Sequence, residues 1–248
     1  MDAVLGAFAV LPGLAVGSFL NVVAARLPER RSVIRPRSAC AACSAPIAWH
    51  DNVPLLSYLV LRGRCRSCGA RIGLVYPAVE LVTAGLLAGC IVAFGPSLRA
   101  AAAALFCAAL VVVTATDITH RIVPNRVVVP ATVAVLALMT VSDPSVEWVV
   151  AGIGASAFLL AAALAYPRGM GMGDVKLALL MGAALGRGVV VALLLGMIAA
   201  LVPAMVLLAR HGSRARKMAL PLAPFLALGS VVALFASETL IDRYLALF

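Results

Sequence analysis

Residues 98–117 read LRAAAAALFCAALVVVTATD, and this stretch decides the class of fold. Between Arg99 and Asp117 it carries no charged residue. An apolar run of this length matches the roughly 20 residues that an α-helix needs to cross the hydrocarbon core of a bilayer. The alanines Ala100–Ala104 leave room for a neighbouring helix to approach closely, which is how helices associate in lipid. The stretch therefore predicts a transmembrane helix that ends at Thr116 and is followed at once by a carboxylate.

Further apolar runs on both sides predict an all-α polytopic integral membrane protein of about eight transmembrane helices. The composition agrees, because 64% of the 248 residues are hydrophobic and only 12% are charged, against about 25% in a soluble domain. The mean hydropathy of +1.09 also exceeds what a water-soluble core can bury. The run at residues 175–185 is short for a full crossing. The predicted spans are Val4–Ala25, Tyr76–Phe94, Leu98–Thr116, Val127–Val141, Trp148–Tyr166, Val175–Leu185, Val189–Ala209 and Leu220–Phe235.

The chain divides by composition into three segments. Residues 1–25 form the first span, which begins with Asp2 rather than a basic region and so is not read as a cleaved signal peptide. Residues 26–74 form a long polar loop, expected to be a small metal-binding domain. Residues 75–248 are expected to form a membrane domain of about seven spans that carries the catalytic groups.

The net charge of +10 reports topology rather than a nucleic-acid partner. With the N-terminus outside, the loops on the inner side hold seventeen of the twenty basic residues, and only Arg99, Arg187 and Arg243 lie outside. The positive-inside rule therefore places the polar loop, Asp117 and Asp174 on the cytoplasmic side. It also makes the anionic lipid headgroups of that leaflet the expected partner of the basic loops, with no nucleic acid.

Asp117 and Asp174 are the candidate catalytic pair. One follows the third predicted span and the other opens the sixth, so two distant helices present carboxylates at the same membrane depth. Two carboxylates that share one proton can activate water and protonate a leaving group, as aspartyl peptidases do. Two alternatives stay open at this point: Asp174 could be an ordinary helix N-cap, and the pair could be the ion sites of a proton- or ion-coupled transporter.

Four further residues are candidates for supporting or substrate-binding roles. Gly171 and Gly173 precede Asp174 and would allow a substrate strand to approach, or the backbone to adopt φ values that other residues avoid. Lys176 could pair with a substrate carboxylate or simply reach the headgroups. Glu80 lies early in the second span and could tune the aspartates, orient the substrate or form a structural ion pair.

Two CxxC pairs, Cys40/Cys43 and Cys65/Cys68, lie in the polar loop. Four thiolates at about this spacing can enclose a tetrahedral, structural Zn²⁺ ion. Disulfides and a thiol oxidoreductase are the competing interpretations, and a reducing cytoplasmic location favours the metal. The other two cysteines, Cys90 and Cys107, fall within spans and are expected to be plain packing residues.

Several stretches resemble the type IV prepilin peptidase family of GxGD aspartyl proteases. Residues 171–177, GMGDVKL, resemble its GxGD-x-K motif, and residues 116–125, TDITHRIVPN, resemble its other aspartate motif. Thr119 stands where many members carry a second acidic residue, so only Asp117 inherits a catalytic assignment from this motif. Residues 17–23, GSFLNVV, and 52–58, NVPLLSY, are also similar to the family.

The resemblance implies a bacterial inner-membrane endopeptidase in which Asp117 and Asp174 are catalytic. It implies removal of the leader peptide of type 4 prepilins or pseudopilins at the cytoplasmic face, with cleavage after a glycine between a basic leader and an apolar helix. Many members hold zinc at the paired cysteines and also methylate the new N-terminus with S-adenosylmethionine. This chain has no glycine-rich Rossmann fingerprint, so a site for the methyl donor cannot be assigned from its sequence.

Overall fold

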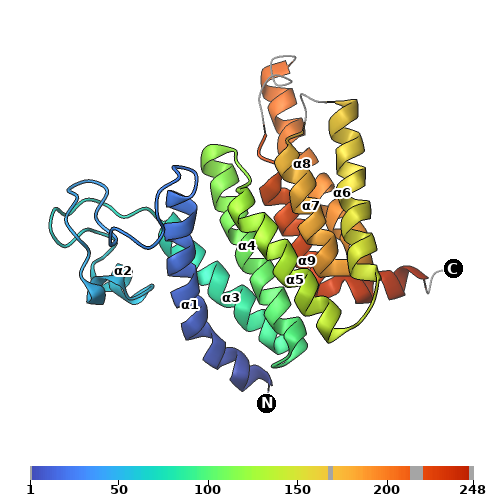
Figure 1. Cartoon of the computed structure of the whole chain (residues 1–248). Coiled ribbons are helices and arrows are strands. Elements are labelled where there is room, and N and C mark those ends of the chain that lie inside the picture. Colours follow the sequence, from blue (N-terminus) through green and yellow to red (C-terminus); the bar gives the residue numbers. More distant parts are fainter. Residues whose placement is uncertain (1, 167–169, 213–219, 246–248) are drawn as a thin grey trace. The chain divides into compact units, whose positions relative to one another are not determined.

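The computed structural model describes residues 2–166, 170–212 and 220–245, and outside the polar loop these residues are mainly helical, in keeping with the predicted all-α class (Figure 1). Apart from two isolated bridges, they form no β-structure. Four of the basic residues that the topology prediction places on the cytoplasmic side lie outside the described residues: Arg168, Arg214, Arg216 and Lys217. The α-helices are α1 Asp2–Arg26, α2 Leu56–Val60, α3 Val75–Phe94, α4 Leu98–His120, α5 Asn125–Ser142, α6 Glu147–Ala165, α7 Met172–Leu185, α8 Val189–His211 and α9 Ala223–Leu245, with 3-10 turns η1 Trp49–Asn52 and η2 Gly186–Gly188.

Six helical stretches of the described chain are long and apolar enough to cross a membrane. The sixth, Met172–His211, contains both the predicted sixth and seventh spans. Within it the chain reverses direction at η2, where Gly186 has a φ of 53°, so α8 runs back opposite to α7 (Figure 1). The apolar part of α9, Ala223–Ser237, corresponds to the eighth predicted span.

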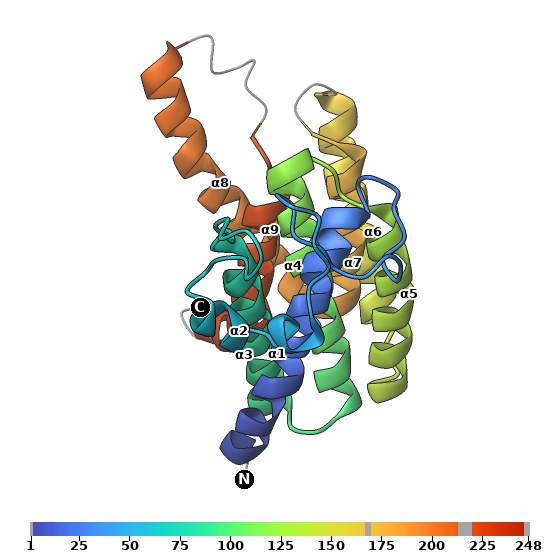
Figure 2. The same cartoon turned by 90° about the vertical axis from the view of Figure 1, so that its left-hand side faces the viewer.

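By packing, the chain forms two compact units: an N-terminal unit, Met1–Ala100, and a C-terminal unit, Ala101–Phe248. In the N-terminal unit α1 packs along α3 (Figure 2). Added Cβ atoms at Gly13 and Gly17 would lie only 2.7 Å from the Cα atoms of Ala84 and Glu80, so glycine is required for this close approach. The helix α3 therefore belongs with α1, although the predicted catalytic segment 75–248 includes it.

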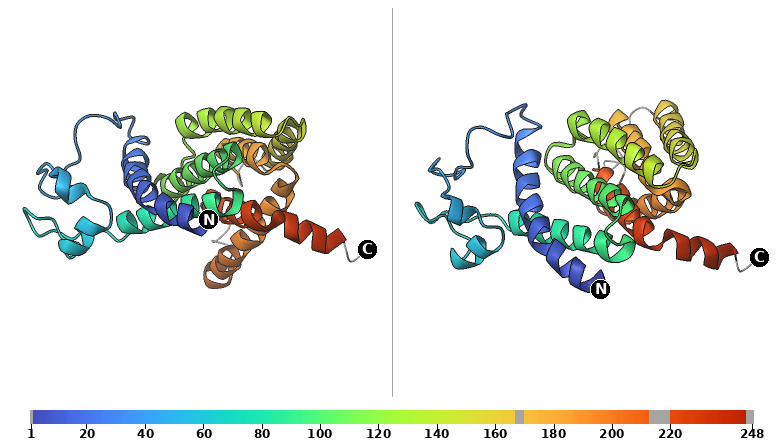
Figure 3. Two further views of the ribbon diagram at one scale, coloured as in Figure 1. Left: turned by 90° about the horizontal axis from the view of Figure 1, so that it is seen from below. Right: turned by 60° about the horizontal axis from the view of Figure 1, so that its bottom comes forward.

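The polar segment between α1 and α3 extends away from this helix pair (Figure 3). It contains α2, η1 and the two isolated bridges, Ala39 with Pro46 and Arg64 with Arg71. The rest of the segment is held by turns. Such a short-range structure has too small an apolar core to be stable without a staple, which makes its four cysteines important.

The centre of the C-terminal unit is α7. This helix contacts α5, α6 and α9, and most of its residues are buried, including Leu177, Leu180 and Met181. Its 14 residues span only about 21 Å, less than the roughly 30 Å of a hydrocarbon core. Because a helix surrounded by protein need not match the bilayer, α7 can be short and still position its first turn accurately.

The structure corrects two predicted helix ends. The helix α4 continues past Thr116 to His120, so Asp117 lies inside its last turn rather than in a polar connection. It ends where Arg121 takes a φ of 55° and donates its N–H to the Asp117 carbonyl at 2.9 Å. The helix α7 begins at Met172, two residues before Asp174.

Candidate active site

Asp117 projects from the last turn of α4 and is 7% exposed. Its Oδ2 accepts a hydrogen bond of 3.1 Å from the backbone N–H of Ala223, the first residue of α9. Although Asp117 lies at the negative end of its own helix dipole, its carboxylate therefore also meets the positive N-terminus of another helix. It is near enough to Arg121 to feel the guanidinium charge.

Asp174 occupies the first turn of α7 and is 8% exposed. Gly171 is the N-cap residue, with φ −84° and ψ 150°, so Asp174 is not at the N-cap position itself but caps the start of the helix from its first turn, as the alternative of a helix-capping Asp174 predicted in part. Asp174 is the third helical residue, and its Oδ2 accepts the N–H of Gly171 at 3.3 Å. This bond fixes the carboxylate at the helix N-terminus.

The two carboxylates lie close enough to interact electrostatically. Each has one oxygen held by a backbone N–H, from Ala223 for Asp117 and from Gly171 for Asp174. Among the described residues no fully buried side-chain oxygen lacks a hydrogen-bond partner, so the second oxygen of each carboxylate keeps some accessible surface. Two nearby carboxylates with one oriented and one accessible oxygen are suited to share a proton and polarise a water molecule.

Two contacts join the start of α7, which carries Asp174, to the chain that follows Asp117. A Cβ added at Gly173 would lie 2.7 Å from Cβ of Val123, so the α4–α5 connection packs directly on the first turn of α7. Lys176 donates from Nζ to Oδ1 of Asn125 at 3.0 Å, which ties α7 to the first residue of α5. Neither Gly171 nor Gly173 has a positive φ, so the predicted need for unusual φ values is wrong; Gly173 is required for close packing instead.

Glu80 belongs to the N-terminal unit, where it is 8% exposed. Its Oε2 accepts the backbone N–H of Leu55 at 2.8 Å. Leu55 precedes α2 and has a φ of 58°, in the left-handed region that a branched side chain rarely adopts. Among the roles predicted for Glu80, this contact supports a structural one. The partner of the carboxylate is a backbone amide, however, and not an arginine.

Cys40, Cys43, Cys65 and Cys68 form a compact cluster in which all sulfur atoms lie within 4.8 Å of one another. The Sγ atoms of Cys40 and Cys68 are 3.9 Å apart, and all four thiols are free. The sulfurs of a tetrahedral zinc site are separated by about 3.8 Å, given a Zn–S distance of about 2.3 Å. This geometry suits a four-coordinate metal and excludes a disulfide in this arrangement. Cys90 and Cys107 are buried, as predicted for packing residues.

The two cysteine pairs are an internal repeat that the sequence analysis missed. Residues 40–47, CAACSAPI, and 65–72, CRSCGARI, share the pattern CxxC-small-Ala-x-Ile. Their turns repeat too: Ser44 and Gly69 donate to the carbonyls of the first cysteines, each at 2.9 Å, and both have positive φ, 58° and 69°. The repeated turns present four sulfurs from two equivalent loops, as zinc knuckles require.

The electrostatics of the cluster favour metal-binding thiolates. Backbone N–H groups of Cys43 and Ala42 lower the pKa of the Cys40 thiol to about 6. The N–H of Ala70 acts to lower the pKa of Cys68 as well, but the hydrogen bonds of Cys68 with the other three cysteines, that with Cys43 above all, outweigh this and raise that pKa to about 11. The N–H groups that favour a thiolate at Cys40 also favour a bound divalent cation, which would convert the four thiols to thiolates.

An ion pair braces the loop beside the second knuckle. Arg66 donates from Nε and Nη2 to the two carboxylate oxygens of Asp51 at 2.8 and 2.6 Å. The guanidinium holds the pKa of Asp51 below its usual range, chiefly through these hydrogen bonds. The Asp51–Arg66 pair therefore helps to hold the loop in place. Nε2 of His50 lies 3.8 Å from Oδ1 of the same Asp51.

The fold and the two sites define a polytopic α-helical membrane protein with a paired-carboxylate centre and a four-cysteine loop. Residues 11–94 match the family described as "Bacterial Peptidase A24 N-terminal domain", and residues 104–205 match the "Type IV leader peptidase family". The chain belongs to the type IV leader peptidase family. The limits of the two matches bracket the boundary between the two compact units.

Curated relatives agree over most of the chain. The "Prepilin leader peptidase/N-methyltransferase" of Bacillus subtilis (strain 168) is 36% identical over 238 residues, which cover 94% of this chain and 95% of the relative. The protein of the same name in Burkholderia pseudomallei (strain 1026b) is 38% identical over 263 residues, with 92% and 84% covered. No solved structure matches the chain. These relatives do not support the transporter alternative.

The backbone N–H groups that hold the two carboxylates could not be predicted from the sequence. Ala223 contributes only its N–H, and an amide donor is common to every residue except proline. Pro224 at the second helical position could have indicated the start of α9, but not its contact with Asp117. The repeat in the cysteine loop, by contrast, was readable from the sequence.

Proposed function

We propose that this chain is a membrane aspartyl endopeptidase that removes the leader peptide of type 4 prepilins or pseudopilins, with Asp117 and Asp174 as its catalytic residues. The observation that carries the proposal is the pair of buried carboxylates, presented by the last turn of α4 and the first turn of α7 within electrostatic range of each other. The family and the names printed for its relatives supply the substrate class.

The geometry supports a general acid–base mechanism. One carboxylate takes a proton from a water molecule as that water attacks the scissile carbonyl, and the other donates a proton to the developing oxyanion. When the tetrahedral intermediate collapses and the C–N bond breaks, its hydroxyl proton returns to the second carboxylate, and the leaving amine takes the proton that the first carboxylate accepted from water. The N–H groups of Ala223 and Gly171 keep one oxygen of each carboxylate oriented through these steps.

The supporting residues act by holding this geometry. Gly173 lets α7 approach Val123, and Lys176 binds Asn125, so both residues position the aspartates rather than contact them. Gly171 supplies the N–H that holds Asp174. Glu80 orders the loop through Leu55.

We place the peptidase in the bacterial inner membrane, with the N-terminus outside and both aspartates at the cytoplasmic face. The support is the distribution of arginine and lysine along the sequence, together with the six membrane-capable helical stretches. An enzyme in this position meets a prepilin whose apolar helix is already in the bilayer and whose basic leader is in the cytoplasm. In the same orientation, anionic headgroups face the basic loops.

The test is cleavage of a model prepilin by purified protein in liposomes. We expect Asp117→Asn and Asp174→Asn each to lower the cleavage rate by about 10²–10⁴-fold or more, because each removes one partner of the acid–base pair. Asp143→Asn is the matched control, since Asp143 is an exposed carboxylate in the turn after α5. If Asp117→Asn or Asp174→Asn inserted at normal levels and still cleaved at the full rate, the assignment of that aspartate as catalytic would be wrong.

We further propose that the cysteine cluster holds a structural zinc ion. Cys40, Cys43, Cys65 and Cys68 have the donor type and the sulfur spacing for a closed tetrahedral site. With all four positions taken by thiolates, such a site staples the loop and has no open position for a reacting water. One zinc per chain, lost in a Cys40→Ser/Cys65→Ser variant, is the expected result of elemental analysis.

N-methylation of the new N-terminus is a second candidate activity, favoured by the name that the relatives carry. The described residues contain no strand–loop–helix unit of the Rossmann type, so they do not fit a nucleotide-binding fold for S-adenosylmethionine. Transfer of labelled methyl from this donor to cleaved substrate, by wild type and by Asp174→Asn supplied with precleaved substrate, tests the second activity separately from the first.

A further inference from the structure

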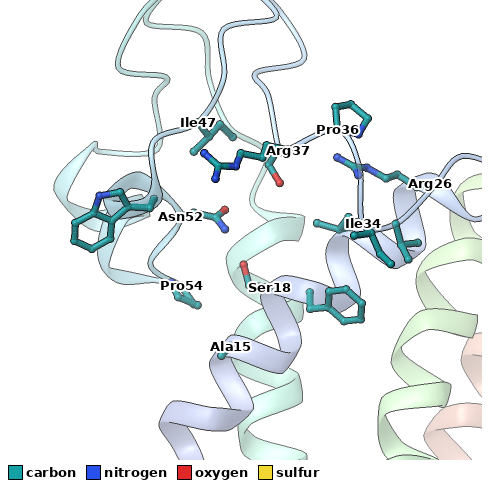
Figure 4. A pocket seen from close by; sticks show the side chains of 14 residues that line it. Ala15, Ser18, Arg26, Ile34, Pro36, Arg37, Ile47, Asn52 and Pro54 are labelled. Atoms are coloured by element: carbon teal, nitrogen blue, oxygen red, sulfur yellow. The ribbon is translucent and has the colours of Figure 1, made fainter.

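The N-terminal unit contains a cavity of about 590 Å³ between α1 and the polar loop (Figure 4). All its lining residues belong to this unit, and the catalytic aspartates take no part in it. Its volume is in the range of small-molecule sites. It also gathers residues from two of the sequence stretches that the peptidase mechanism does not use, residues 17–23 and 52–58.

One wall of the cavity is a single face of α1. The wall residues recur at helical spacing, and from first to last they cover a length of about 16 Å along the helix. This length is close to the hydrocarbon depth of one leaflet, about 15 Å. From Ala15 to Val22 the wall side chains are apolar or small, and the last wall residue, Arg26, adds a guanidinium group. These residues are Ala15, Ser18, Phe19, Val22 and Arg26.

The opposite wall comes from the loop and adds polar groups at the same end. Arg37, Ser38 and Asn52 line the cavity together with Arg26 (Figure 4). Arg26 donates from Nη1 to the carbonyl of Ser32 at 3.1 Å, which orients its guanidinium. Of the described residues that line the cavity, none is acidic, so its two positive charges are not neutralised from within.

Three of the side chains that line the cavity are apolar and exposed, which suits the edge of a bilayer. Trp49 is 84% exposed, Ile34 81% and Phe19 52%. All three line the cavity. Tryptophan is enriched at the headgroup level of membranes, where one end of the ring is apolar and the other can be hydrated. An apolar wall on a membrane helix, two arginines at its end and an interfacial tryptophan together match an anionic amphiphile.

We infer that this cavity binds an anionic phospholipid. The phosphate lies between the Arg26 and Arg37 guanidinium groups, and one acyl chain follows the α1 face toward Ala15. Arginine is suited to phosphate because its planar fork can donate two parallel hydrogen bonds. The bound lipid fills the space between α1 and the loop that carries the cysteine cluster. This inference is independent of the proposed peptidase activity.

The test uses Trp49 as a built-in reporter. The chain has two tryptophans, so Trp148→Phe leaves Trp49 as the sole emitter. The protein is placed in phosphatidylcholine nanodiscs that contain the same mole fraction of brominated phosphatidylglycerol or brominated phosphatidylcholine. We expect brominated phosphatidylglycerol to quench Trp49 more strongly, with a lipid preference of about fivefold for each arginine engaged.

Three double variants show which arginines cause the preference for anionic lipid. Arg26→Gln/Arg37→Gln should abolish the preference, and Arg26→Lys/Arg37→Lys should retain part of it. The control Arg64→Gln/Arg71→Gln removes the same charge from exposed positions of the same loop that do not line the cavity, and should keep the preference. Unchanged metal content in every variant establishes that the loop is folded.

Several outcomes would overturn the inference. Equal quenching of wild type by the two brominated lipids would show that no anionic lipid is selected. An equal loss in the control pair would show that only the overall charge of the loop matters. Recovery of Trp49 emission on adding inorganic phosphate or S-adenosylmethionine would show that the cavity takes a soluble anion or the methyl donor instead of a lipid.

Discussion

At the scale of single residues, Gly173 shows how tightly the first turn of α7, which carries the proposed catalytic Asp174, is positioned. A Cβ at this position would lie 2.7 Å from Cβ and 2.9 Å from Cγ2 of Val123. Val123 Cβ is attached directly to the backbone, so the clash can be relieved only by moving α7 or the α4–α5 connection. Either movement displaces Asp174 relative to Asp117.

We therefore expect Gly173→Ala to lower the prepilin cleavage rate at least about tenfold, because a misplacement of about 1 Å at the reacting groups can cost about 10²-fold in rate. Gly171→Ala is the matched control, because its added Cβ would meet no atom closer than 3.8 Å and its backbone is extended. Val123→Gly in the Gly173→Ala background should restore part of the rate. Equal effects of the two alanine substitutions would contradict this account of the glycine.

Asp51 gives a pH dependence to the cysteine loop. The hydrogen bonds from Arg66 lower the pKa of Asp51 in the folded loop, so the carboxylate stabilises the loop above its unfolded pKa of about 3.9 and this contribution disappears as pH falls through the lower folded value. We expect Asp51→Asn to release metal to a chelator faster than wild type at neutral pH. The two proteins should converge as the pH falls below about 4. A constant ratio of release rates across this range would contradict the role of the ion pair.

At the scale of helices, small residues set the spacing of three close pairs. Gly17 lies against α3, Gly182 against α6, and Gly229 against Gly196 of α8. In each case an added Cβ would meet the backbone of the neighbouring helix. Close backbone approach replaces the hydrophobic driving force that helices lack in lipid.

Gly182→Ala should therefore destabilise the C-terminal unit by about 1–3 kcal/mol, because the added methyl group would meet the Ala151 carbonyl and lie 2.5 Å from Cα of Gly152. The measurement is the thermal unfolding midpoint in detergent. Gly154→Ala, in the interior of the neighbouring α6 and with no atom within 4 Å of the added Cβ, should leave the midpoint unchanged or raise it. If Gly154→Ala were as harmful as Gly182→Ala, packing between α6 and α7 would not be the cause.

The helices and the candidate residues of both sites could be predicted because their signals are local. Spans follow from apolar run length, and the cysteine cluster follows from two CxxC pairs. The contacts that complete the sites are not local: Asp117 binds an amide 106 residues away, and Lys176 reaches Asn125. The predicted end of the helix at Thr116 is wrong because a charged residue does not by itself end a helix: α4 continues through Asp117 for another turn to His120.

At the scale of the whole molecule, the two compact units divide the chemistry. The cysteine cluster lies in Met1–Ala100, and both carboxylates lie in Ala101–Phe248. The two family matches, 11–94 and 104–205, follow the same division. The stability of the loop and the geometry of the carboxylate pair should therefore respond separately to perturbation.

Removal of the proposed zinc ion from the membrane-inserted chain tests this separation. Without it, the four thiols lose their common ligand, and the loop between residues 38 and 72 retains mainly turn hydrogen bonds and the Asp51–Arg66 ion pair. We expect a thiol-competitive chelator to increase amide hydrogen exchange in this loop by at least about tenfold, while α4 and α7 keep their protection. Cys40→Ser/Cys65→Ser should show the same exchange pattern without chelator, and Asp174→Asn should show normal protection of the loop. If protection around Asp117 and Asp174 falls together with that of the loop, the units are coupled and the metal also supports the catalytic geometry.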